Sequence, residues 1–225
     1  MGCKTLNQDA PWRAPSSIPG ATIVRERTIL GPDGTEVAFG GDAGRGEEPW
    51  LKVRRKGAEP EPLEGFDATW GNVRQLSSGP SGGLYIAGGD GVFCAPWSDL
   101  SQGHWLKGIG AARGVAELGP DLLAVLQHQS LAVFVRNDRG EWQAAGTRKL
   151  KMLDEIGALA GSGLCCVTER FRRTFVFRVE SSGDEFKVSP VCEVDGAGEL
   201  RASQGRVYVD TGAEDQVVEL VGAIP

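Results

Sequence analysis

One stretch of the chain has the residue types and spacing of a catalytic motif. Gly79-Pro80-Ser81-Gly82-Gly83 matches the G-x-S-x-G form of a nucleophile elbow, in which a histidine activates a serine held between a strand and a helix. In this sequence a strand pattern follows the glycines instead, and Gly-Pro-Asp begins in the same way at Gly31 and at Gly119. We therefore interpret residues 79–83 as a structural turn.

The histidines and cysteines do not form a set with recognisable chemistry. There are two histidines and five cysteines. His128 has only Ser130 close by in the sequence as a nucleophile, and no C-x-x-C pair offers the spacing of a zinc site. An odd number of scattered cysteines does not indicate a disulfide framework, so we expect reduced, buried thiols in a cytoplasmic protein. The sequence predicts no catalytic residue, no metal and no cofactor.

The net charge limits the classes of partner. The chain has 24 Lys+Arg against 30 Asp+Glu, a formal charge of −6. Nucleic acids and anionic membranes attract basic surfaces, so this balance argues against both. No apolar run approaches the roughly 20 residues of a membrane-spanning helix. Residues 1–4 also lack the apolar stretch of a secretion signal.

Short strands are the elements that must position any site. Alternating apolar runs such as 131–135 and 174–179 are bounded by Gly, Asp, Asn and Ser, which is typical of strands and turns. Residues 150–159 could suit a short helix, but Gly157 argues against it. A unit of strand, glycine-containing turn and apolar strand recurs about every 40 residues. Its turns start at residues 31, 79, 119, 161 and 203.

Each unit continues as a hairpin, except that the fifth reaches the C-terminus one strand short. The segment Pro11-Trp12-Arg13 stands before the first unit at the spacing expected of a fourth strand. We therefore predict that residues 10–20 supply the missing strand to the last unit.

Five units of four short antiparallel strands, with the two ends of the chain sharing one unit, resemble a five-bladed β-propeller. The resemblance implies an all-β fold of four-stranded antiparallel blades, whose ring is closed by an N-terminal strand in the last blade. A β-sandwich or two small barrels is the alternative. The implied organisation is a tail at 1–9 and a single domain at 10–225, with blades at 22–66, 67–109, 110–150, 151–192 and 193–225 plus 10–20.

One hairpin also resembles part of the Asp-box of sialidase-like propellers, S-x-D-x-G-x-x-W. The matching residues are Asp138-Arg139-Gly140-Glu141-Trp142. Arg136 stands in place of the serine, and Trp142 comes one residue early. Such boxes build hairpin turns, so the match favours the propeller and implies no chemistry.

Propellers generally bind ligands on the face formed by the loops between second and third strands and by the connections between blades. The resemblance therefore implies a set of ligand-binding candidates on those loops: Asp42, Arg45, Trp70, Asp90, His128, Glu169, Arg170, Arg172, Arg173 and Asp210. The loop at 168–173 is the richest in arginine and could clamp a carboxylate, a phosphate or an acidic peptide. The alternative is a solvated loop that balances an acidic protein. His104 is expected on the opposite face from His128.

The expected function is that of a non-catalytic module that docks a protein or peptide on this loop face. The first alternative is a carbohydrate-binding lectin, because Trp70-Gly71-Asn72-Val73 through Trp105 is similar to one blade of the tachylectin-type lectins. Trp50 and Trp70 would then stack on sugars. The second alternative is a propeller glycosidase. Its carboxylates would converge on the central channel from Asp42, Asp90, Glu169 and Asp210.

Overall fold

A computed structural model gives the fold of most of the chain. It describes residues 2–6, 27–40, 50–66, 73–150, 155–159, 162–169, 173–182, 185–203, 206–211 and 217–221. Within these ranges the chain forms five sheets of four antiparallel strands each. No helix in the described ranges has the length and apolar character needed to cross a bilayer.

The first four sheets are each continuous in sequence. The first consists of β2 (Arg27–Leu30), β3 (Glu36–Gly40), β4 (Trp50–Arg54) and β5 (Glu61–Pro62). The second consists of β6 (Val73–Ser78), β7 (Gly83–Gly88), β8 (Gly91–Pro96) and β9 (His104–Trp105), with the 3-10 helix η3 (Leu100–Gln102) before β9. The third consists of β10 (Gly114–Gly119), β11 (Leu122–Leu126), β12 (Ser130–Arg136) and β13 (Trp142–Lys149). The fourth consists of β14 (Glu155–Leu159), β15 (Leu164–Glu169), β16 (Arg173–Ser182) and β17 (Glu185–Asp195).

The fifth sheet joins the two ends of the chain. It consists of β18 (Glu199–Ser203), β19 (Arg206–Asp210), β20 (Val217–Val221) and β1 (Gly2–Leu6). β1 pairs with β20 in the register Cys3 to Leu220 and Thr5 to Val218. The segment 10–20, predicted to supply a strand here, lies outside the described residues. The strand that pairs with β20, β1, lies within residues 1–9, which we predicted to be a tail. The sequence did not predict this strand, because its five mixed residues give no clear strand signal and their pairing depends on the partner strand.

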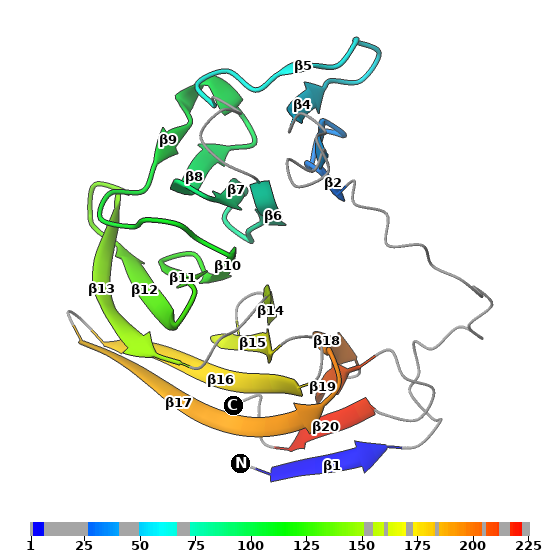
Figure 1. Cartoon of the computed structure of the whole chain (residues 1–225), viewed down its shortest axis with the longest axis vertical. Coiled ribbons are helices and arrows are strands. Elements are labelled where there is room, and N and C mark those ends of the chain that lie inside the picture. The colour runs from blue at the N-terminus through cyan, green and yellow to red at the C-terminus, as the bar shows by residue number, and fades with distance from the viewer. Residues whose placement is uncertain are drawn as a thin grey trace.

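The sheets follow one another along an arc, from β2–β5 at the top of Figure 1 through β10–β13 at the left to β18–β20 and β1 at the bottom. Their first strands contact one another in chain order: β2 with β6, β6 with β10, β10 with β14, and β14 with β18. This arrangement is propeller-like, because the first strand of each sheet lies on the inner side of the arc.

Each pair of consecutive sheets encloses its own buried apolar cluster. Along β7, Leu84 and Ile86 pack toward the first sheet, whereas Tyr85 and Ala87 pack toward the third. Neighbouring side chains of a strand point to opposite faces, so a strand covered on both faces must be apolar at nearly every position. Cys165 and Cys166 follow the same rule, one facing the third sheet and the other the fifth.

The strand prediction for 150–159 is confirmed where the structure describes it, because residues 155–159 form β14 rather than a helix. The predicted first turns are also confirmed at 31–35 and 79–82, each followed by a strand. β17 runs to Asp195, beyond the boundary expected at residue 192.

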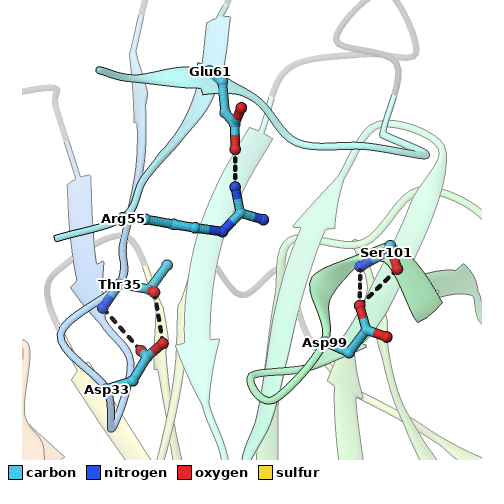
Figure 2. Close-up of polar contacts among 6 residues, drawn as sticks. All are labelled: Asp33, Thr35, Arg55, Glu61, Asp99 and Ser101. Carbon is cyan, nitrogen blue, oxygen red and sulfur yellow. Dashed lines mark hydrogen bonds and ion pairs between the residues drawn. The ribbon is translucent and has the colours of Figure 1, made fainter. Parts of the chain in front are cut away.

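Short polar side chains fix the turns at one end of the sheets, as Figure 2 shows. The Asp33 carboxylate accepts hydrogen bonds from the backbone N–H of Thr35 at 2.9 Å and from its hydroxyl at 2.8 Å, and these bonds lower the pKa of Asp33. Asp99 accepts from the hydroxyl and the backbone N–H of Ser101, which lowers its pKa in the same way. Arg55 pairs with Glu61 across the β4–β5 turn.

The connections of an antiparallel meander alternate between its two ends. The turns at 31–35, 55–60, 79–82, 97–103, 120–121 and 137–141 therefore share one end of the molecule, which we call the turn face. The second-to-third-strand turns at 89–90 and 127–129 share the other end, which we call the loop face.

Candidate functional site

A hollow of about 260 Å³ opens at the turn face between the second and third sheets. Ser81 and Gly82 of the β6–β7 turn and Gly83 at the start of β7 form one wall, and Gln102 of η3 and His104 at the start of β9 also line the hollow. The third sheet supplies the opposite wall, with Arg136 at the end of β12 and Trp142 at the start of β13. The hollow therefore draws its lining from three turns.

Arg136 is the principal charge on the wall of this hollow. Its guanidinium carbon lies 4.4 Å from the centroid of the Trp142 ring, in cation–π contact. Its Nη2 donates a hydrogen bond to the Ser81 hydroxyl at 3.3 Å, whereas its buried Nε has no hydrogen-bond partner in the described part of the chain. Among the described residues, no carboxylate lies within ion-pair distance of Arg136. The guanidinium is thus positioned by a ring and a hydroxyl rather than neutralised.

A buried carboxylate is hydrogen-bonded to two of the residues that line the hollow. Glu117 of β10 is only 3% exposed and accepts a hydrogen bond from the Tyr85 hydroxyl at 2.8 Å and from the Ser81 N–H at 3.3 Å. Burial raises the pKa of Tyr85 well above its usual value, and the charge of Glu117 and the hydrogen bond to it raise it further. Tyr85 is therefore a neutral donor to Glu117 at physiological pH, and its ring meets Trp142 edge-on at 6.4 Å.

The turn at 79–83 makes room for this pair of side chains. The Gly82 N–H donates to the Gly79 carbonyl at 3.1 Å, and Gly82 has a φ of +81°, a conformation that favours glycine. A Cβ on Gly79 would lie 1.6 Å from Glu117 Oε2, and one on Gly83 would lie 2.7 Å from the Tyr85 hydroxyl. The interpretation of this motif as a structural turn is confirmed, since β7 follows it directly.

The structure describes five of the ten residues proposed from the loops: Asp90, His128, Glu169, Arg173 and Asp210. Asp90 and His128 are exposed on separate turns of the loop face. Arg173 forms ion pairs with Glu169 at 3.5 Å and with Glu193 at 2.7 Å. Asp210 forms an ion pair with Arg201, with 3.2 Å between Oδ2 and Nε. The other five candidates lie outside the described residues: Asp42, Arg45, Trp70, Arg170 and Arg172.

The residues around the hollow were not among those candidates, although the sequence held two signals for them. Glu117 is a charged residue inside an otherwise apolar strand, which indicates a carboxylate that must find buried donors. Arg136 and Trp142 are the two positions at which the hairpin departs from the Asp-box pattern. The same two residues form the cation–π contact.

Comparison with known proteins identifies the fold and leaves the family open. No protein-family model and no curated protein sequence matches the chain. A crystal structure of selenomethionine-substituted virginiamycin B lyase from Staphylococcus aureus, a β-propeller, is similar, with a TM-score of 0.54 and 11% sequence identity. The match covers 85% of this chain and 64% of that chain. The likeness shows an all-β, propeller-like fold.

Cys94, which also lines the hollow, should be unreactive in the folded protein. Burial raises the pKa of Cys94 and of Cys165, and it raises the pKa of Cys166 from 9.0 to about 11. The thiolate is the reactive form, so a pKa shift of this size lowers its population about a hundredfold near pH 8. We expect these three thiols to react with a disulfide reagent far more slowly in the native protein than after unfolding in denaturant. Fast native labelling that mass spectrometry assigns to Cys94 would contradict this expectation.

Proposed function

We propose that the chain is a five-bladed β-propeller, closed through β1 in its last blade, that acts as a non-catalytic module docking a protein or peptide partner at the hollow of the turn face. The pairing of β1 with β20 supports the closure, because it ties the N-terminal segment to the final sheet. The five four-stranded sheets support the blade count, and the propeller neighbour supports the architecture.

One observation carries the functional proposal: Arg136 stacks on Trp142 at the wall of an open hollow without a carboxylate partner among the described residues. Tryptophan, tyrosine and arginine are the residues that most often dominate the energy of a protein interface. Here the buried Tyr85 ring meets Trp142 edge-on, so the stacked pair is held in place before a partner arrives. A positioned anchor of this kind loses little conformational entropy on binding.

The loop at 168–173 is the other candidate docking site. The contacts of its described residues make it a weaker candidate than the hollow. Arg173 is already engaged by Glu169 and Glu193, so an anion would have to displace two carboxylates from it. Its guanidinium is exposed, and these ion pairs are weak, but they compete with any ligand. Arg170 and Arg172 would have to carry recognition at this loop.

Selection from a displayed random-peptide library tests the proposed docking face. Ser81→Trp places a large side chain at the mouth of the hollow, and Gln129→Trp places the same side chain at an exposed position of the loop face. Peptides selected on the wild-type protein should lose at least about tenfold in affinity for Ser81→Trp, because they lose their pocket. The same peptides should keep their affinity for Gln129→Trp.

The opposite pattern would move the docking site to the loop face. In that case Arg170→Ala combined with Arg173→Ala would be the next variant to test, since it removes two arginines of the 168–173 loop. If no peptide is enriched over the background of an unrelated protein, the proposal of a peptide-docking module is wrong.

A further inference from the structure

We infer that the hollow of the turn face recognises a carboxylate group of its partner through Arg136. This inference rests on the proposed docking function and adds the chemical group that is recognised. Its basis is the hydrogen-bonding capacity of the guanidinium, the occupation of the Trp142 ring and the position of Glu117.

Most N–H donors of the Arg136 guanidinium make no hydrogen bond to the described residues. A guanidinium carries five N–H donors in a planar fork that matches the two oxygens of a carboxylate. Only the bond from Nη2 to the Ser81 hydroxyl occupies this fork among the described residues, and at 3.3 Å it is long.

The stacking of Arg136 on Trp142 also excludes a competing kind of ligand. Sugars and aromatic groups bind tryptophan through its ring face. The guanidinium covers a face of Trp142 at 4.4 Å, and Tyr85 meets the ring at 62°. A ligand entering here meets the guanidinium edge rather than a bare aromatic platform, which favours a planar anion over a neutral sugar.

The negative charge of Glu117 limits the charge that a bound anion can carry. The two oxygens of Glu117 already accept from Tyr85 and Ser81, so it does not compete for Arg136. Glu117 accepts a hydrogen bond from the Ser81 N–H and Arg136 donates one to the Ser81 hydroxyl, so both charges lie beside the same residue. Repulsion from a buried carboxylate grows with the charge of the ligand, which favours a singly charged carboxylate over a phosphate.

The size of the hollow suits one side chain with its neighbouring backbone. About 260 Å³ falls near the lower limit of the volumes of small-molecule sites. The carboxylate could belong to an acidic side chain or to a free C-terminus, because both present the same pair of oxygens.

Binding of three tripeptides distinguishes a side-chain carboxylate from a C-terminal one. Affinities are measured by NMR titration, following the indole N–H signal of Trp142. The signal is assigned by its loss in Trp142→Phe. The first is acetylated, amidated Ala-Ala-Glu, which carries only a side-chain carboxylate. The second is acetylated Ala-Ala-Ala with a free C-terminus, and the third is acetylated, amidated Ala-Ala-Gln, which is neutral. At least one carboxylate peptide should bind about tenfold more tightly than the glutamine peptide. The tighter of the two identifies the source.

Matched arginine variants connect the preference to Arg136. Arg136→Gln should abolish the difference between the peptides, and Arg136→Lys should reduce it, because lysine keeps the charge and loses the fork. Arg139→Gln, which removes an exposed arginine of the same hairpin, should leave the difference unchanged. A cooperative thermal unfolding transition is the control that each variant is folded.

Three results would overturn the carboxylate inference. They are equal binding or no binding of all three peptides, an unchanged preference in Arg136→Gln, and tighter binding of inorganic phosphate than of either carboxylate peptide. None of them decides the docking function, which the library selection with Ser81→Trp tests separately.

Discussion

Replacing Gly79 by alanine should destabilise the protein by about 3 kcal/mol, because the new methyl group and the Glu117 carboxylate cannot occupy the same space. A Cβ at this position would lie 1.6 Å from Oε2, 2.5 Å from Cδ and 2.8 Å from Cβ of Glu117. Glu117 would have to leave its donors, the Ser81 N–H and the Tyr85 hydroxyl, and become a poorly satisfied buried charge. Chemical denaturation of the variant measures the loss.

Two further variants show whether the steric conflict with Glu117 is the cause. In a Glu117→Ala background, the penalty for Gly79→Ala should fall to about 1 kcal/mol, since only the Cβ contact remains. Gly119 begins the corresponding turn of the third sheet, and a Cβ there would meet no atom within 4 Å. Gly119→Ala should therefore change stability by less than about 0.5 kcal/mol. Equal penalties at positions 79 and 119 would show that alanine acts through the turn backbone and not through Glu117.

Removing the Tyr85 hydroxyl should cost about 2 kcal/mol at neutral pH, because Glu117 loses a charge-assisted hydrogen bond in a buried site. Tyr85→Phe keeps the ring, which is 1% exposed and fills the space between the second and third sheets. Denaturation of the variant and of Tyr85→Phe combined with Glu117→Ala gives the coupling between the two side chains. No loss of stability in Tyr85→Phe would contradict the described contact.

The same variant has a pH signature. The pKa of Tyr85 is raised above 10.0 in the folded protein, so above about pH 10 the unfolded chain releases a proton that the folded protein retains. Stability is therefore fully present below pH 10 and falls as the pH rises, by up to about 1.4 kcal/mol per pH unit from this residue alone. Tyr85→Phe lacks this contribution, so its deficit relative to the wild type should shrink above pH 10. A constant deficit through that range would argue that Tyr85 titrates normally.

Much of the propeller-like fold can be predicted from the sequence because it depends on local patterns. Alternation and turn glycines predict strands and first turns, and the recurrence of Gly-Pro at residues 31, 79 and 119 predicts the repeat. The resulting strands are confirmed in the described sheets. β1 could not be found in this way, because its five mixed residues show no local pattern and they pair with β20 at the far end of the sequence.

The candidate site could not be predicted because its contacts join residues that are distant in sequence. Ser81 and Tyr85 meet Glu117 and Arg136 only when the second sheet packs on the third. Sequence spacing gives each turn its place at one end of a sheet, but it does not say which side chains cross to the neighbouring sheet. The candidates drawn from the 168–173 loop illustrate the limit, because Arg173 is held by Glu169 and Glu193.

The central claim is that the hollow of the turn face, beside Arg136, is where a partner docks. Its most direct test is an NMR map of backbone amide shifts on addition of a peptide selected from the library. We expect the largest changes at residues 81–83, 102–104 and 136–142, which surround the hollow. Changes concentrated at residues 89–90 and 127–129 would place docking on the loop face and contradict the claim.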